Sequence, residues 1–184
     1  VLITTKGGNK DQKTTFSYDG YYGFQNPWKK LDVLDGSQYM SVMNEASIND
    51  GRSPMFPQAV RDTINTNTNW QDEMFNFNGP KTSHTISISG GSKVGSFASS
   101  LNYFKQEGLV GPGKSEFDRI TFRIKGARTF KKLTLGSNVN LVRIQSKGIS
   151  TNSGYGAGLN QAINLQPIIP VKNADGTWGV PGDY

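Results

Sequence analysis

Apolar and polar residues alternate along five segments of the chain, at about residues 14–24, 82–90, 96–107, 117–128 and 133–144. Successive side chains of a β-strand point to opposite faces, so this alternation predicts strands that are apolar on one side and polar on the other. The segments are longer than the usual strand of about five or six residues. The pattern therefore predicts an all-β fold with about five long strands.

The links between these segments alternate between short and long. Residues 91–95 join the second segment to the third, and about residues 129–132 join the fourth to the fifth. The first link runs from about residue 25 to residue 80, and the third is GLVGPGKSE. A half-apolar sheet can have one wet side, or it can be a membrane barrel with lipid outside and water inside. The alternation favours the barrel, because outer-membrane barrels combine short periplasmic turns with long extracellular loops.

The positions of the charged residues fit a barrel and give its orientation. Arg119, Arg123 and Lys125 share the polar face of the fourth segment. A cation that faces lipid at the membrane midplane costs roughly 2–4 kcal/mol, so these three side chains are expected to face the lumen. Three further cations fall on the apolar face, but close to segment ends, where long side chains can extend to the interface; they are Lys105, Arg128 and Arg143.

A short helix is expected inside the first long link. Asp35 is placed to cap it, with Gln38 three residues later as in a capping box. Apolar residues recur at helical spacing beyond this cap, which predicts local packing rather than a cofactor site; they are Tyr39, Met40, Val42, Met43 and Ala46.

Composition excludes several other classes of protein. There is no cysteine, so disulfide frameworks and thiolate metal sites are excluded. The net charge of +6 is spread along the chain without a basic and aromatic cluster, which disfavours nucleic acid as a partner. No apolar run approaches the roughly 20 residues of a membrane helix. Because the chain starts within an apparent buried strand and stops in a loop, we expect it to be part of a longer protein.

The stretch GLVGPGKS, residues 108–115, matches the phosphate-binding pattern G-x-x-x-x-G-K-[ST]. Such a loop binds phosphate only where it opens a helix, because the helix N-terminus supplies the N–H groups and the dipole. The following FDRITFRIK alternates with a period of two and cannot open a helix. The stretch is therefore expected to be an extracellular turn, and no nucleotide is expected as a ligand.

No catalytic residues, metal site or cofactor are expected. His84 is the only histidine, and the carboxylate pairs Asp72–Glu73 and Asp32/Asp35 lie among ordinary loop residues, where solvation or capping explains them. Three aromatic residues of the expected extracellular loops are candidates for stacking on a sugar, although packing that holds the loops in place is the favoured explanation; they are Trp28, Trp70 and Tyr155.

Several stretches resemble one family. VLITTKGG followed by FSYDGYYGFQ resembles the plug-to-barrel junction of SusC/RagA-like TonB-dependent outer-membrane transporters. Further stretches resemble the same family and follow in its order. They are LDGSQYMSVMNEA, NWQDEMF and SGGSKVGSFASSLNYFKQEGLV, the last of which leads to FDRITFRIKGARTF. The resemblance covers most of residues 1–145 and is looser from about Lys147 onward.

The resemblance implies a plug-filled transmembrane antiparallel barrel of about 22 strands, of which this chain would supply about five. Residues 1–10 would be the last strand of the plug and a linker, and residues 11–184 the N-terminal part of the barrel. Such proteins are not enzymes. They import oligosaccharides, or in some members peptides, across the Gram-negative outer membrane, and their partners are TonB, a SusD-like surface lipoprotein and outer-membrane lipid.

The alternative is a soluble, secreted all-β module that binds carbohydrate on its wet face. The two hypotheses differ in what covers the apolar face. A barrel exposes this face to lipid, whereas a soluble module must cover it with a second layer.

Overall fold

The computed structural model describes residues 7–150, 153 and 157–182. The chain forms two compact units. The first comprises the described residues of Val1–Asn26 together with Phe77–Leu109 and Gly113–Gly148. The second comprises Pro27–Asn76, Val110–Pro112 and the described residues of Ile149–Tyr184.

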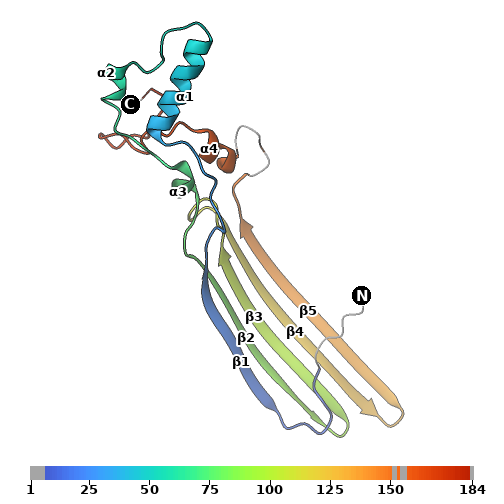
Figure 1. Cartoon of the computed structure of the whole chain (residues 1–184). Helices are drawn as coiled ribbons and strands as arrows, with labels where there is room; N and C mark the ends of the chain where they lie inside the picture. Colours follow the sequence, from blue (N-terminus) through green and yellow to red (C-terminus); the bar gives the residue numbers. More distant parts are fainter. Residues whose placement is uncertain (1–6, 151–152, 154–156, 183–184) are drawn as a thin grey trace. The chain divides into compact units, whose positions relative to one another are not determined.

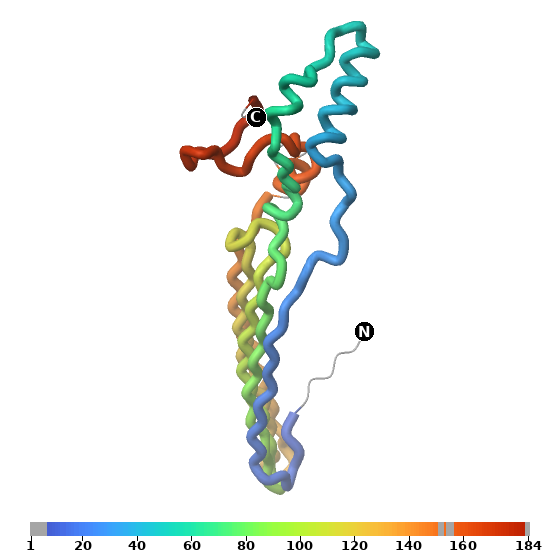
Figure 2. The backbone as a smooth tube through the Cα atoms, turned by 60° about the vertical axis from the view of Figure 1, so that its left-hand side comes forward, coloured from blue at the N-terminus to red at the C-terminus, as the bar shows by residue number. Residues whose placement is uncertain are grey.

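The first unit is a five-stranded antiparallel sheet in which every strand pairs with its neighbour in the sequence. The strands lie side by side in chain order (Figure 1) and are β1 (Thr15–Gln25), β2 (Gly79–Ser92), β3 (Gly95–Glu107), β4 (Glu116–Phe130) and β5 (Leu133–Lys147). Viewed from the side, they form a single layer (Figure 2). The predicted all-β fold with about five strands is confirmed, and the structure extends most of the strands beyond the expected segments.

The links differ as the sequence predicts. Only Lys93 and Val94 separate β2 from β3, and only Lys131 and Lys132 separate β4 from β5. Lys131 has a φ of 53°, which lets the chain reverse within this tight turn. We call the end of the sheet with these turns the hairpin end, and the opposite end, where β1, β3 and β5 finish, the loop end.

The strand register gives the sheet two chemically different faces. Side chains of directly paired residues lie on the same face, so each row across the sheet can be assigned to one side. One central row contains Tyr18, Ile86, Leu101, Phe122 and Leu141 and belongs to what we call the apolar face. The adjacent row contains Asp19, Thr85, Asn102, Thr121 and Val142 and belongs to the polar face.

The second unit contains four helices and a small core. The helices are α1 (Gly36–Asn49), α2 (Gln58–Arg61), α3 (Trp70–Met74) and α4 (Gly158–Asn164). The predicted capping box at α1 is present, because the Asp35 carboxylate accepts from the Gln38 N–H at 2.7 Å and the Gln38 side chain accepts from the Asp35 N–H at 3.1 Å. Helices α2, α3 and α4 were not predicted.

Helix α1 packs as its sequence pattern predicts. Met40 is buried with Phe56, Ile64 and Ile168, and Tyr39 and Met43 pack against this cluster. Val42, which is 49% exposed, and Ala46, which is also exposed, do not take part in this packing. No helix in the described part of the chain is long and apolar enough to cross a membrane.

Candidate functional site

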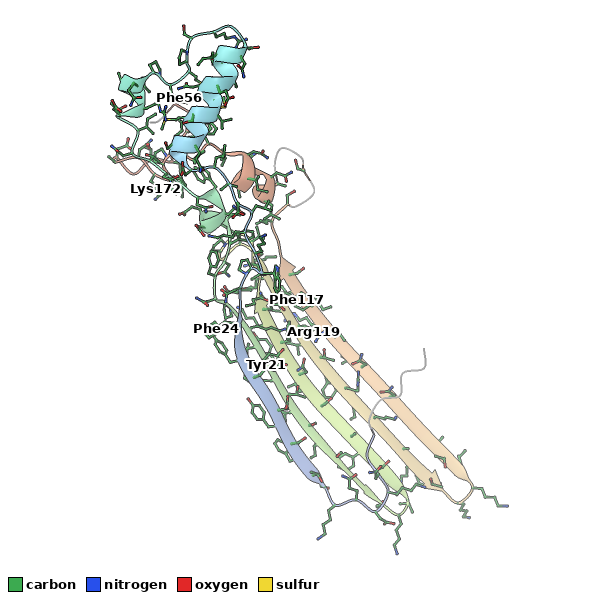
Figure 3. All side chains as sticks on the ribbon, in the orientation of Figure 1. Tyr21, Phe24, Phe56, Phe117, Arg119 and Lys172 are labelled. Atoms are coloured by element: carbon green, nitrogen blue, oxygen red, sulfur yellow. The ribbon has the colours of Figure 1, made fainter. Side chains whose placement is uncertain are left out.

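The polar face of the sheet carries a cluster of cations and aromatic rings toward the loop end. Phe104 lies between two cations, with Lys81 Nζ 5.6 Å and the Arg119 guanidinium carbon 5.4 Å from its ring centre. The Phe117 ring meets Phe104 edge-on at 6.0 Å. Phe117 and Arg119 lie in the half of β4 nearest the loop end (Figure 3). Each cation is held over a ring face, where the ring's charge distribution attracts it.

Next to this cluster, the polar face has a hollow of about 450 Å³ that contains two of the predicted lumen-facing residues. Arg119 and Arg123 line it together with polar residues of β3 and β4, and Val142 and Ile144 complete its wall. Asn102, one of the lining residues, donates hydrogen bonds to Ser83 Oγ at 3.2 Å and Thr85 Oγ1 at 2.8 Å. Two guanidinium groups beside hydroxyl and amide groups suit an anionic or hydroxyl-rich ligand.

Lys125, the third predicted lumen-facing residue, shares this face but lies outside the hollow. An added Cβ at Gly7 would lie 3.6 Å from the Lys125 side chain, so the segment before β1 reaches the polar face of the sheet. An added Cβ at Gly8 would meet the backbone oxygens of Phe97 and Gly90, which means that this crossing leaves no room for a side chain. The Gly91 N–H donates to the backbone oxygen of Gln12 at 2.9 Å and fixes the crossing near the hairpin end.

The apolar face is more exposed than the polar face, which is the reverse of a soluble protein. Ile86 is 44% exposed, Leu101 46% and Leu141 60%, and every core residue buried among the described part of the chain belongs to the second unit. In the middle of β2 the apolar-face residues His84, Ile86 and Ile88 are exposed, whereas the polar-face residues between them are half-buried. No described residue of the chain forms a second layer over this face.

Polar groups on the apolar face bond to one another. Tyr18 Oη lies 2.7 Å from His84 Nδ1, and His84 Nε2 lies 2.8 Å from Thr82 Oγ1. Thr82 in turn donates to the backbone oxygen of Tyr21 at 3.2 Å. One tautomer satisfies the whole chain, with the Tyr18 hydroxyl donating to Nδ1 and Nε2–H donating to Thr82. His84 lies inside β2, which begins at Gly79.

The second unit has a groove of about 340 Å³ beside Trp70. Tyr39, Asp32 and Asn164 also line it. The Trp70 indole N–H donates to the backbone oxygen of Gln166 at 2.9 Å, so this ring holds two distant segments together. Asp72, one member of the acidic pair beside Trp70, binds Lys30 Nζ at 2.5 Å.

The other candidate aromatic residues differ from Trp70. Trp28 is 100% exposed. Tyr155 lies outside the described residues. Sequence reasoning missed Trp178, which is 69% exposed with Lys172 Nζ 4.8 Å from its ring centre. The sequence ADG at residues 174–176 is typical of a turn, and this signal could have indicated that the nearby Trp178 lies in an exposed loop.

The Asp175 carboxylate organises this turn. It accepts a hydrogen bond from Thr177 Oγ1 at 2.6 Å and another from the Thr177 N–H at 2.9 Å. These two hydrogen bonds hold the pKa of Asp175 below its ordinary value, and the bond from the Thr177 hydroxyl has the larger effect. The positive φ of Gly176, 84°, lets the chain turn between the two partners.

The chain is similar along its whole length to part of the TonB-dependent receptor SusC of Bacteroides thetaiotaomicron. The two are 30% identical over 184 residues, which are 100% of this chain and 17% of the receptor. TonB-dependent receptor P3 of Formosa agariphila is 29% identical over 185 residues, covering 98% of this chain and 17% of the receptor. No family model matches the chain.

Two solved structures have the same fold. The RagAB peptide transporter matches with a TM-score of 0.74 at 18% identity, over 89% of this chain and 21% of that one. The RagAB peptide importer in its closed-closed state gives 0.72 at 17% identity, over 95% and 22%. Together these likenesses support a fragment of a SusC/RagA-like TonB-dependent transporter. It spans about a sixth of the length of the curated relatives it matches.

Similarity to the SusC/RagA-like class accounts for the exposed apolar face. TonB-dependent receptors of this class are outer-membrane β-barrel proteins, and the five-stranded sheet corresponds to part of a barrel wall. The soluble-module alternative needs a second layer over the apolar face, and the described residues provide none. The similarity to TonB-dependent receptors along the whole chain favours the barrel over this alternative.

The structure shows where the P-loop pattern lies and whether the described residues include a group that could bind a metal ion. Residues 108–115 form the link between β3 and β4, and β4 starts at Glu116, so no helix follows the P-loop pattern. The Gly108 N–H donates to the Ser115 backbone oxygen at 2.9 Å and closes this link as a turn. Among the described residues, no group of three or more His, Cys, Asp or Glu could hold a metal ion.

Proposed function

We propose that this chain forms the first part of the barrel wall of a transporter that imports oligosaccharides or peptides across the outer membrane, with energy relayed by TonB. The transporter works as an importer and not as an enzyme. The observation that carries the proposal is the exposed apolar face, together with the similarity to SusC along the whole chain. An apolar outer surface and a polar inner one suit a wall between lipid and an aqueous interior.

In this proposal, residues 1–10 are the last strand of the plug and its linker, and residues 11–184 begin the barrel. The surroundings of Gly7 and Gly8 support the division, because the Lys125 side chain lies beside Gly7 and the backbone of β2 and β3 lies beside Gly8. The segment before β1 therefore approaches the polar face. A chain that comes from a plug must approach the wall from the lumen, so this crossing also supports a polar face that points inward.

Arg119, Arg123 and Lys125 then face the lumen. Arg119 and Arg123 lie together in the hollow of the polar face, where they can bind carboxylates of the plug or polar groups of a passing substrate. Lys125 has a different role, because its side chain lies beside Gly7 in the segment that enters the wall.

Among the candidate substrate contacts, Trp28 suits the role best. Its ring is fully exposed and can stack on a sugar or a peptide side chain. Trp70 acts through packing instead, because its indole N–H is bonded within the second unit. Tyr155 stays a candidate on sequence grounds alone.

The partners follow from the same class of transporter. The full protein would contact TonB through its N-terminal region, outside this chain, and a SusD-like lipoprotein would cover the extracellular mouth. The RagAB peptide transporter supports a peptide as one substrate class. The class of the chain supports an oligosaccharide as the other.

Growth of the host strain tests the proposal. A strain that lacks the full-length gene is grown with oligosaccharide mixtures or peptide mixtures as the only nutrient source. The intact gene should restore growth on one of these, and a version without the TonB-contacting segment should not. Restoration by both versions would show that import does not depend on TonB.

A matched pair of variants tests the two tryptophans. Trp28→Ala should reduce uptake at low substrate concentration while the amount of transporter in the membrane stays normal. Trp70→Ala should reduce the amount of folded transporter. Normal uptake by Trp28→Ala at every substrate concentration would remove Trp28 from the site.

A further inference from the structure

We infer that the apolar face ends, at the loop end of the sheet, in a binding site for the phosphate group of an outer-leaflet membrane lipid. The site consists of three cations on β3 and β5, the strands on either side of β4, which we call the outer cationic cluster: Lys105, Arg143 and Lys147. The inference rests on the orientation proposed above, in which the apolar face meets lipid, and it goes beyond the import function.

The register places the outer cationic cluster on the apolar face. Arg143 pairs with Ile120, which lies on the apolar face of β4. Lys147 is four residues farther along β5, on the same face, and pairs with Glu116. Lys105 pairs with Asp118, so it shares this face too. All three lie closer to the loop end than the central row of Leu101 and Phe122.

Two acidic residues lie among these cations, and each already has a partner. Glu116 Oε2 accepts from Lys105 Nζ at 3.1 Å. The Asp118 carboxylate accepts from Tyr103 Oη at 3.4 Å. Arg143 and Lys147 are exposed, and no ion pair within the described chain involves either of them. The five charged groups together carry a net charge of +1, so the cluster favours an anion.

The surface between Lys105 and Arg143 is hollowed. Seven residues line a depression of about 210 Å³: Tyr103, Lys105, Asp118, Arg119, Ile120, Arg143 and Gln145; Lys147 is not among them. The ammonium, guanidinium, hydroxyl and amide groups all supply hydrogen-bond donors. A tetrahedral phosphate accepts from several donors at once, which suits this arrangement.

The apolar surface beside the hollow identifies the ligand as a lipid. Ile120 is 41% exposed and Leu141 60% exposed, and both lie on the same face toward the centre of the sheet. A ligand that fills the hollow and continues along this strip must combine an anionic head with apolar chains. A soluble anion would use the donors and leave the strip in water. A lipid of the leaflet that surrounds the loop end satisfies both surfaces.

The hairpin end provides a matched control. It also carries exposed cations, Lys131 and Lys132, but these lie in a tight turn and not on the apolar face. Nearby, Arg128 lies over the Phe130 ring at 4.7 Å from its centre. Removing two turn lysines changes the net charge as much as removing two members of the outer cationic cluster, without touching the hollow.

The experiment measures lipid retention by the full-length transporter in detergent. The purified protein is mixed with a synthetic glucosamine-based lipid that carries phosphate groups, or with its dephosphorylated form, and the bound lipid is counted by native mass spectrometry. The wild type and Lys131→Gln/Lys132→Gln should retain the phosphorylated lipid equally. Arg143→Gln/Lys147→Gln should retain it at least tenfold more weakly, because each cation near a charged membrane surface contributes about a fivefold change in affinity.

The other outcomes separate this inference from the proposed function. Equal losses in the two double variants, or none in either, would overturn the site, and so would equal retention of the phosphorylated and dephosphorylated lipids by the wild type. A full-length protein that is soluble without detergent and retains neither lipid would instead contradict the proposed membrane function.

Discussion

Leu101→Arg places a guanidinium at the centre of the apolar face and should strongly destabilise the barrel in a membrane. Leu101 pairs with Ile86 on one side and Phe122 on the other, so its neighbours on both adjacent strands are apolar. Its side chain is 46% exposed within this chain, and in the proposed orientation the exposed part meets lipid.

The strand geometry indicates how deep this position lies. On the apolar face of β4, Asp118 and Arg128 enclose the apolar stretch and are ten positions apart. At about 3.3 Å per residue and a strand tilt of about 45°, this stretch is roughly 23 Å high. That height is close to the apolar band of about 25 Å in outer-membrane barrels. Phe122, the partner of Leu101, lies near its middle, where an arginine costs about 2–4 kcal/mol, or roughly 30- to 900-fold in the folding equilibrium.

Two controls distinguish lipid from water and from a protein interior. Thr85→Arg lies on the polar face, where Asp19 is its direct neighbour, and it loses one hydrogen bond from Asn102. It should change the free energy of unfolding by no more than about 1 kcal/mol. Leu101→Trp should be tolerated, because lipid adapts to a larger side chain, whereas overpacking a protein core costs about 1–3 kcal/mol.

The assay is urea unfolding of the full-length protein in lipid vesicles, followed by the electrophoretic mobility of unheated samples, which separates folded barrels from unfolded chains. Equal midpoints for Leu101→Arg and Thr85→Arg would mean that water reaches both faces. A large loss in Leu101→Trp would mean that protein, not lipid, covers the apolar face. Either result refutes the proposed orientation.

Three further predictions concern other parts of the chain in the full-length protein. Asp35→Ala removes the cap of α1 and should cost about 1 kcal/mol locally, seen as faster proteolysis of the first long link. Tyr18→Phe leaves a ring nitrogen of His84 without its donor and should lower the urea midpoint by the equivalent of about 1–3 kcal/mol, whereas the double variant with His84→Phe should recover part of this loss. Gly8→Val should detach the segment before β1 and expose it to protease, whereas Gly23→Val, where an added Cβ meets nothing within 4 Å, should not.

The sequence predicted the features that depend on nearby residues. Alternation assigned Arg119 and Phe122 to opposite faces because strand geometry fixes the direction of successive side chains. The cap of α1 was recognised because Asp35 and Gln38 are three residues apart. The hairpins followed from the short links. Each of these features is local, so a short window of sequence contains the information.

Features that depend on distant partners were not predictable. The core residue Ile168 packs against Met40 from far along the chain, and no local pattern connects the two. β2 starts at Gly79 because Gln25, the last residue of β1, pairs with Gly79. The sequence around Pro80 and Lys81 does not alternate between apolar and polar residues, so it did not predict this start. Helices α2 and α3 are too short to show a period of 3.6 residues.

The candidate site was predicted in part. Sequence reasoning placed Arg119, Arg123 and Lys125 on one face, but only the structure shows that the first two share a hollow. It treated the tryptophans alike, although Trp28 is fully exposed and Trp70 is bonded to Gln166. Exposure depends on the packing of the whole unit, which the identity of a residue does not reveal.

The free edge of β1 limits how the complete barrel can assemble. β2, β3 and β4 pair with their neighbours in sequence on both sides, so these pairings can form as soon as each hairpin exists. β1 has a partner only on its β2 side, and in a closed barrel its other edge must bond to the last strand of the whole protein. That contact closes the longest loop in the chain and must therefore form late. Until then β1 offers a row of unpaired N–H and C=O groups, so the slow step of assembly, and its main risk of wrong pairing, lies at this strand.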